Sequence, residues 1–246
     1  MKNTTLIVGA NSNIGSFISQ KLIEKNHNLL LLIHKNDSRI RDLEAEYPSR
    51  IYIEKINLES EKSVENGIEE IINKSGFAIN NLIHFSSLRS SDSKKLSETN
   101  SEFWEKIIKV NLLGTYYILK KTIPYLRESQ GKIILFSSNV TRIGLPNGSA
   151  YSASKAAISN LVRTLAQEEP NILINAISPG PVKIDNSQFP EEYVKFRQKY
   201  YSEKLNSIPL KRLASFEDVF GLVNFLISEE NKYITGEEFF LTGGSL

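Results

Sequence analysis

Short apolar runs alternate with longer segments of helical periodicity along almost the whole chain. Most of these runs are apolar at consecutive positions, which is typical of strands buried on both faces of a parallel sheet. The predicted strands are Thr4–Val8, Asn28–Ile33, Arg50–Ile56, Asn80–Phe85, Gly131–Phe136, Ile172–Ile177 and Glu238–Leu241. The predicted helices are Asn13–Lys25, Ser38–Tyr47, Ser60–Ser75, Ser101–Glu128, Ala150–Glu168 and Phe216–Ser228. We therefore expect an α/β fold with one doubly wound parallel sheet of about seven strands and helices on both faces.

The length of 246 residues fits one domain, and no linker or repeat interrupts it, so we predict a single domain over 1–246. The net charge of +2 is too small for a nucleic-acid-binding protein. Cysteine is absent and the histidines are scattered, so we predict no disulfide, thiolate chemistry or metal. The apolar runs are too short for a secretion signal or a membrane span, which predicts a cytoplasmic protein without a membrane partner.

A turn with two glycines joins the first predicted strand to the first predicted helix. A phosphate group needs close approach of the backbone, which glycine permits, and the positive end of a helix dipole. Strand–helix turns also use glycine for geometry alone, so the turn by itself is weak evidence. In its context we predict a Rossmann-type dinucleotide site formed by Gly9, Asn11, Ser12, Asn13, Ile14 and Gly15.

The second predicted strand is followed by His34 and Lys35. Sites that prefer NAD(H) usually place an acidic residue here, on the ribose hydroxyls. The acid is missing, and His34 and Lys35 could face a 2′-phosphate instead, although Lys35 could equally be a solvated loop charge. The sequence therefore favours NADP(H) over NAD(H).

Tyr151 and Lys155 lie four residues apart in a predicted helix and therefore share one face. A lysine ammonium beside a phenol favours the phenolate, so such a tyrosine can give or take a proton near neutral pH. Ser138 follows the strand beside that helix and could hydrogen-bond the same substrate oxygen. The same spacing recurs at Tyr116/Lys120, Tyr117/Lys121 and Tyr200/Lys204, where packing and surface roles are the expected ones.

Together these motifs resemble the short-chain dehydrogenase/reductase family over nearly the whole chain. The matching segments are Val8–Gly15, Val110–Gly114, Ser137–Ser138, Tyr151–Lys155, Asn175–Gly180, Pro209–Leu213, Tyr233–Gly236 and Gly243–Gly244. The resemblance implies that Ser138 orients the substrate carbonyl and that Tyr151 is the acid/base. It also implies that Lys155 binds the nicotinamide ribose and that Asn111 holds a water that relays protons to Lys155. The same resemblance implies cofactor contacts at Tyr151, Lys155, Asn57, Leu58, Ser86, Pro179, Gly180 and Val182.

The sequence departs from the family pattern at several cofactor positions. The middle glycine of the turn is Asn13, a residue that tolerates left-handed backbone. The family's Asn-Asn-Ala-Gly after the fourth strand is replaced by His84–Ser87. Asn57 stands for the usual aspartate after the third strand, and Ile184 for a threonine that contacts the carboxamide. These changes affect the cofactor contacts more than the predicted catalytic residues.

One segment, at about 183–212, contains no clear strand and follows the sixth predicted strand, at the edge of the sheet where ligands bind. A long insertion there is typical of a substrate lid, and we expect it to form one or two short helices. The alternative is that its aromatic residues complete the core or a subunit interface. These residues are Phe189, Tyr193, Phe196, Tyr200 and Tyr201.

We expect an oxidoreductase that transfers a hydride between nicotinamide and a ketone or secondary alcohol. The closest resemblance is to 3-oxoacyl-[acyl-carrier-protein] reductases, but the two basic positions that dock the carrier protein there are Ser129 and Pro170 here. A 3-oxoacyl carrier-protein substrate, a small ketone, or a non-catalytic dinucleotide sensor therefore stay open. We expect a homotetramer or a dimer, because two predicted helices are apolar on more than one face. The residues concerned are Ile107, Leu112, Leu113, Tyr116, Ile118, Leu119, Ile158, Leu161 and Leu165.

Overall fold

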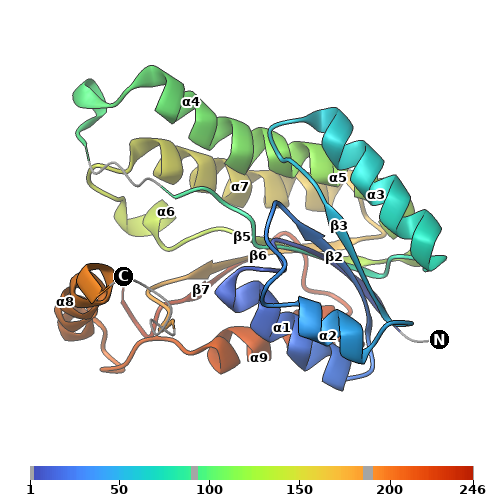
Figure 1. Ribbon diagram of the computed structural model, residues 1–246. Coiled ribbons are helices and arrows are strands. Elements are labelled where there is room, and N and C mark those ends of the chain that lie inside the picture. Colours follow the sequence, from blue (N-terminus) through green and yellow to red (C-terminus); the bar gives the residue numbers. More distant parts are fainter. Residues whose placement is uncertain (1–2, 90–93, 185–190, 246) are drawn as a thin grey trace.

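The computed structural model describes residues 3–89, 94–184 and 191–245, without the side chains of 193, 196 and 197. Seven parallel strands form one sheet in the order β3-β2-β1-β4-β5-β6-β7, which confirms the predicted fold class (Figure 1). The strands are β1 (Thr4–Val8), β2 (Asn28–Ile33), β3 (Ile51–Lys55), β4 (Asn81–His84), β5 (Lys132–Phe136), β6 (Leu173–Pro179) and β7 (Glu238–Leu241).

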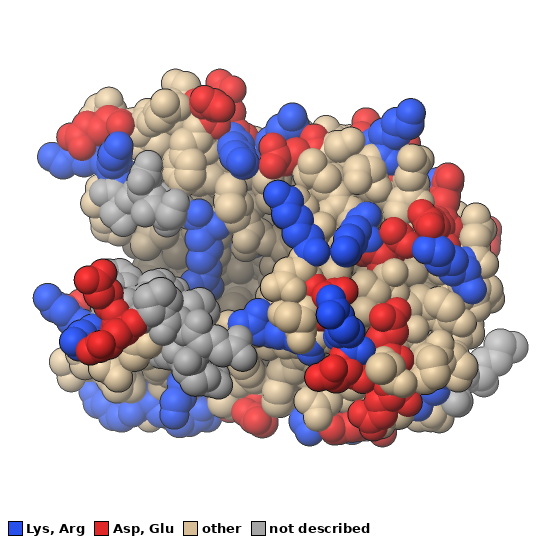
Figure 2. Space-filling view, viewed as in Figure 1, with Lys and Arg blue, Asp and Glu red and all other residues tan. Residues whose placement is uncertain are grey.

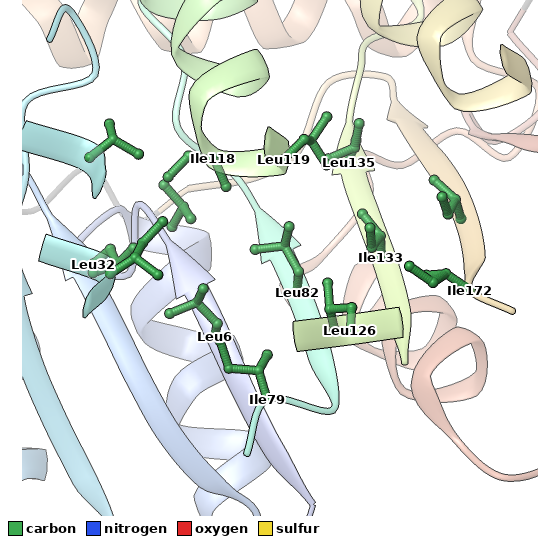
Figure 3. Close-up of a cluster of buried hydrophobic side chains, with 14 of the residues drawn as sticks. Leu6, Leu32, Ile79, Leu82, Ile118, Leu119, Leu126, Ile133, Leu135 and Ile172 are labelled. Carbon is green, nitrogen blue, oxygen red and sulfur yellow. The ribbon is translucent and has the colours of Figure 1, made fainter. Parts of the chain in front are cut away.

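Helices cover both faces of the sheet (Figure 1). One face carries α3 (Glu61–Ser75), α5 (Gly114–Ser129) and α7 (Ser149–Glu168), and the other carries α1 (Asn13–Glu24) and α9 (Phe216–Ile227). Successive strand residues point to opposite faces, so Ile133 and Leu135 pack in one core cluster and Ile134 in the other. Figure 3 shows part of the first cluster, where leucines and isoleucines from β1, β2, β4 and β5 meet those of α5. Burial on both faces explains why the strands are apolar at consecutive positions.

The structure differs from the prediction in the segment Ser101–Glu128, which is interrupted rather than one regular helix. It contains α4 (Ser101–Ile108), the π-helix η2 (Lys109–Leu113) and all of α5 except its last residue. A π-helix inserts one residue per turn, which sequence periodicity does not report, and such turns are frequent at functional sites. The remaining described helices are α2 (Arg41–Glu46), η1 (Leu96–Glu98), α6 (Val140–Ile143) and α8 (Glu191–Ser207).

Within the described part of the predicted lid segment, residues Glu191–Ser207 form one long helix, α8, whereas the prediction was one or two short helices. Tyr201 is buried and its hydroxyl donates to the Val182 carbonyl at 3.1 Å, so this aromatic residue fixes α8 to the segment after β6. Tyr200 is half-buried and lines a cavity described below. Phe189 and the side chains of Tyr193 and Phe196 lie outside the described part of the chain.

A crevice opens at the centre of the sheet, between β1 and β4, because the strand order reverses there. The order runs outward from β1 to β3 on one side and from β4 to β7 on the other, so the connections after β1 and β4 diverge. Ligands bind in the crevice at the carboxyl ends of strands at such a switch point. The glycine turn follows β1 and the segment 85–88 follows β4, so both border this crevice.

Candidate active site

The two glycines of the turn stand where a side chain has no room. Gly9 has φ of +86°, and a Cβ on it would lie 2.6 Å from the Ser86 Oγ. A Cβ on Gly15 would collide with the Gly9 carbonyl oxygen. The Ser12 Oγ accepts a hydrogen bond from the Gly15 N–H at 3.0 Å and begins α1. The backbone of the turn is therefore exposed to the crevice at the positive end of a helix dipole, as a phosphate group requires.

Neither asparagine of the turn replaces a glycine by adopting left-handed backbone. Asn13 is the first residue of α1 and is not among the residues with positive φ, so its side chain requires no left-handed backbone. The Asn11 Oδ1 accepts a hydrogen bond from the Arg39 backbone N–H at 2.9 Å. The Asn11 side chain therefore holds the segment after β2 beside the turn.

A cavity of about 550 Å³ lies above the turn, and we call it the glycine-turn cavity. His34 and Lys35 line it and are exposed, and Lys106 of α4, which the sequence did not single out, lines it too. Asp37 is held by Arg41 at 2.6 Å, and this hydrogen bond lowers the pKa of the Asp37 carboxyl. The predicted cofactor residues that line this cavity are Gly9, Asn11, Ser12, His34, Lys35, Asn57, Leu58 and Ser86.

A second cavity of about 450 Å³, the Tyr151 cavity, adjoins the first and shares Ser12, Phe85 and Ser87 with it. Figure 2 shows a hollow in the surface on the left of the view, between the part of the molecule that contains α4 and the part that contains α8 (compare Figure 1). The predicted site residues that line it are Ser12, Asn13, Ile14, Ser138, Tyr151, Lys155, Pro179, Gly180 and Val182. The two adjoining cavities both border the glycine turn, and together they extend from Lys35 to Tyr151.

Lys155 is almost completely buried beside Tyr151. Its Nζ donates to the Phe136 carbonyl at 2.7 Å and lies 5.7 Å from the centre of the Tyr151 ring. Burial lowers the pKa of Lys155 to about 7, and the nearby charge of Arg89 acts in the same direction. Any anion that binds in this cavity offsets both causes and favours the ammonium form.

Asn111 lies in the π-helix η2, outside the lining of both cavities. Its Oδ1 accepts from the Leu88 N–H at 2.7 Å, and its Nδ2 donates to the Leu88 carbonyl at 3.0 Å and to the Ser154 Oγ at 3.0 Å. Its own carbonyl accepts from the Thr115 Oγ1 at 2.6 Å. The structure thus brings Ser138, Tyr151 and Lys155 together around one cavity. Asn111 lines neither cavity and instead fixes Leu88, in the segment after β4.

His84, the first of the four residues that depart from the family's Asn-Asn-Ala-Gly, is the last residue of β4. It is buried, and its Nε2 lies 2.9 Å from the Thr115 Oγ1. Burial and the charge of Lys155 lower the pKa of His84 to about 3, so the imidazole is neutral at neutral pH. Thr115 thus connects the His84 ring with the Asn111 carbonyl.

Glu238 on β7 forms a buried centre of hydrogen bonds that the sequence did not reveal. Its side chain is only 6% exposed. The Oε1 accepts from the hydroxyls of Ser178 at 2.6 Å, Ser159 at 2.7 Å and Thr141 at 3.2 Å. The Oε2 lies 3.4 Å from an Arg163 nitrogen. A carboxylate this far from water is tolerated because hydroxyls and a cation satisfy it.

The Glu238 network reaches the backbone of two predicted catalytic residues. The Ser159 Oγ lies 2.8 Å from the Ser137 Oγ, and the Ser137 Oγ donates to the Lys155 carbonyl at 3.0 Å. The Thr141 Oγ1 donates to the Ser138 carbonyl at 3.0 Å. Glu238 therefore connects β6, β7, α6 and α7 beside the Tyr151 cavity.

In the described part of the chain no group of His, Asp and Glu is arranged to hold a metal ion, and no helix could cross a membrane.

Comparison with known proteins agrees with this geometry. A family model described as enoyl-(acyl carrier protein) reductase matches residues 9–245. The chain is 31% identical to the 3-oxoacyl-[acyl-carrier-protein] reductase FabG of Buchnera aphidicola subsp. Acyrthosiphon pisum, over 99% of this chain and 97% of that protein. It superposes on the structure of ElxO with NADP bound with a TM-score of 0.88 and 26% identity, covering 100% and 99% of the two chains.

A further solved structure carries the family name in its own description. It is a short-chain dehydrogenase/reductase, glucose/ribitol dehydrogenase, from Brucella melitensis, with a TM-score of 0.85, 25% identity and coverage of 100% and 99%. The fold, the glycine turn, the Tyr/Lys helix and these matches agree over the full chain. The chain therefore belongs to the short-chain dehydrogenase/reductase family of oxidoreductases.

Proposed function

We propose that the protein is an NADP(H)-dependent oxidoreductase that transfers a hydride between nicotinamide and a ketone or secondary alcohol. One observation carries the proposal: Ser138, Tyr151 and Lys155 line a cavity that adjoins the glycine-turn cavity through Ser12 and Phe85. When bound, the nicotinamide would supply or accept the hydride. The protein's own residues must then bind the carbonyl oxygen and supply a proton.

Tyr151 is the proposed proton donor for the carbonyl oxygen in the direction of reduction. Its helix position brings the Lys155 ammonium to one side, and a cation there stabilises the phenolate that remains. The Ser138 hydroxyl, at the edge of the same cavity, would donate a hydrogen bond to the substrate oxygen as negative charge develops. Asn111 contributes by fixing Leu88, which lines the glycine-turn cavity and directly precedes Arg89 of the Tyr151 cavity.

Two features support NADP(H) as the cofactor. His34 and Lys35 border the glycine-turn cavity, and the nearby Asp37 is committed to Arg41 rather than to a ribose hydroxyl. The similar ElxO structures are described with NADP bound and, for a variant of that protein, with NADPH bound. A 2′-phosphate beside Lys35 would gain charge-assisted hydrogen bonds.

The substrate proposal covers small ketones and 3-oxoacyl carrier-protein thioesters, the latter because several relatives are named 3-oxoacyl-[acyl-carrier-protein] reductases. Turnover of NADPH on a panel containing both classes tests the proposal. Tight NADPH binding without turnover on any ketone would favour the non-catalytic sensor instead. A cytoplasmic location, the absence of nucleic-acid and membrane partners, and a lid role for 183–212 stay predictions from the sequence.

Replacing Tyr151 with phenylalanine should lower kcat at least about 100-fold, because general acid–base catalysis typically contributes 10²- to 10⁴-fold. The affinity for NADPH should change little, because the ring packing is kept. Steady-state kinetics and NADPH titration measure the two effects. Tyr117→Phe is the matched control, since Tyr117 has the same spacing to a lysine but lines neither cavity. A Tyr151→Phe enzyme that keeps more than about a tenth of the rate would refute the role.

Replacing Glu238 with glutamine should lower kcat about ten-fold with a smaller change in KM for NADPH. The glutamine presents an N–H₂ donor to hydroxyls or to Arg163, so the backbones of Ser138 and Lys155 lose their fixed positions, and small misplacements cost large factors in rate. Glu237→Gln, at the exposed position just before β7, is the control and should leave kcat unchanged. Equal kinetics for both variants would mean that the network is structural only.

Replacing Lys35 with aspartate should lower kcat/KM for NADPH about ten-fold and leave the value for NADH unchanged or raised, because the carboxylate repels a 2′-phosphate. Lys62→Asp introduces the same charge at an exposed position outside both cavities and should leave the preference unchanged. The comparison requires kinetics with both cofactors. Better use of NADH than of NADPH by the unmodified enzyme would contradict the cofactor proposal.

Two exposed residues narrow the surface on which the predicted oligomer would form. Ile107, Ile118 and Ile158 are buried within the chain, whereas Leu113 and Tyr116 of the η2–α5 region are 41% and 48% exposed. We propose that these two residues lie in a subunit interface of a homotetramer or dimer. Light scattering at micromolar concentration should give a multiple of the 27.8 kDa chain mass. A monomeric mass would show this proposal to be wrong.

A further inference from the structure

Arg89 gives the Tyr151 cavity a charge that the general reaction does not require. Among the described residues that line this cavity, Arg89 and Lys155 are the charged ones, and none is acidic. The remaining lining is uncharged, and it includes the apolar residues Leu145, Val182 and Ile184. The two cations therefore favour a ligand that carries a negative group.

The position of Arg89 is determined by a predicted catalytic residue. Asn111 holds both the N–H and the carbonyl of Leu88, so the peptide that leads into Arg89 is fixed beside the cavity. The Arg89 side chain is exposed, and within the described ranges neither a hydrogen bond nor an ion pair engages its guanidinium. An arginine that is placed by a rigid backbone and has unused donors suits planar, bidentate recognition of a carboxylate or a phosphate.

Arg89 also lies close enough to the reaction centre for its charge to act on Lys155. The Arg89 charge lowers the pKa of the buried Lys155 and so disfavours the ammonium form beside Tyr151. An anion bound at Arg89 would remove this penalty at the moment when substrate is present. The anionic group would then lie near the carbonyl that Tyr151 and Ser138 bind, rather than at the far end of a long substrate.

We infer that the natural substrate is a ketone, or the corresponding secondary alcohol, that carries a carboxylate or phosphate near the reacting carbon, and that Arg89 binds this group. The inference rests on the proposed function, since it assigns a substrate class to the same site. No new chemical step is involved: the carbonyl carbon gains the hydride, its oxygen gains a proton from Tyr151, and the anionic group is unchanged.

The test compares charged and neutral ketones of similar size. Acetoacetate is paired with methyl acetoacetate, and dihydroxyacetone phosphate with dihydroxyacetone, so the two pairs distinguish a carboxylate from a phosphate. The unmodified enzyme should prefer the charged member of at least one pair by about ten-fold or more in kcat/KM, as expected for a charge-assisted hydrogen bond. Arg89→Gln should abolish this preference, with a much smaller effect on the neutral member, and Arg89→Lys should keep part of it.

Lys95→Gln is the matched control, because it removes one exposed positive charge from the same region outside both cavities. It should leave the preference of the unmodified enzyme unchanged. Loss of activity on both members of a pair by equal factors in Arg89→Gln, or a rise in KM for NADPH alone, would overturn the inference and assign Arg89 to the cofactor or to structure. No preference in the unmodified enzyme would overturn it as well.

The dissociation constants of the same compounds for the NADPH complex, measured by calorimetry, separate this inference from the proposed function. If no ketone is reduced, the proposed function fails, and the charged compounds still reveal whether Arg89 binds an anion. If ketones are reduced but the dissociation constants of charged and neutral members agree within each pair, the proposed function stands and the Arg89 inference fails.

Discussion

The parallel pairing of β1 with β4 is the constraint on which the rest of this structure depends. The chain reverses its direction of travel across the sheet between these two strands, so the connections that follow them diverge and open a crevice. The glycine turn and the segment 85–88 border that crevice, and they pack so closely that Gly9 has no room for a Cβ. Both cavities border these two segments, since Ser12 of the turn and Phe85 and Ser87 after β4 line each of them. A change that separates the turn from Ser86 would disturb cofactor and substrate sites together.

Behind the crevice, two sets of buried hydrogen bonds fix the reacting side. Asn111 holds Leu88 from the π-helix η2, and Glu238 holds the backbones of Ser138 and Lys155 through three hydroxyl groups. Buried polar groups are costly unless they are satisfied, and satisfied networks favour one arrangement of the surrounding elements. In this protein both networks connect to residues that line the Tyr151 cavity or to their immediate neighbours. The two networks therefore fix the backbone around the proposed reaction site.

The sequence predicts the fold well because strands buried on both faces are apolar at consecutive positions, and such runs are easy to recognise between amphipathic helices. It also predicts Ser138, Tyr151 and Lys155, which line one cavity although they come from different elements of the chain. It does not predict η2, because a π-helix inserts a residue without altering composition. Glu238, Arg89 and Lys106 were missed because a single charged residue has no pattern, and only the packing of β7, β4 and α4 gives each its surroundings. The long helix α8 was expected as short pieces, since its apolar residues show little helical periodicity.

The central claim is that a carbonyl substrate at Tyr151 receives a hydride from a dinucleotide that extends from the glycine turn. The most direct measurement uses NADPH that carries two deuterium atoms at C4 of the nicotinamide, so that transfer from either face carries the label, with a reducible ketone in ordinary water, and follows the product by NMR. Hydride transfer predicts one deuterium on the carbinol carbon of the product and none on its oxygen, which exchanges with water. Binding of labelled NADPH without transfer of deuterium to any ketone of the panel would contradict the claim.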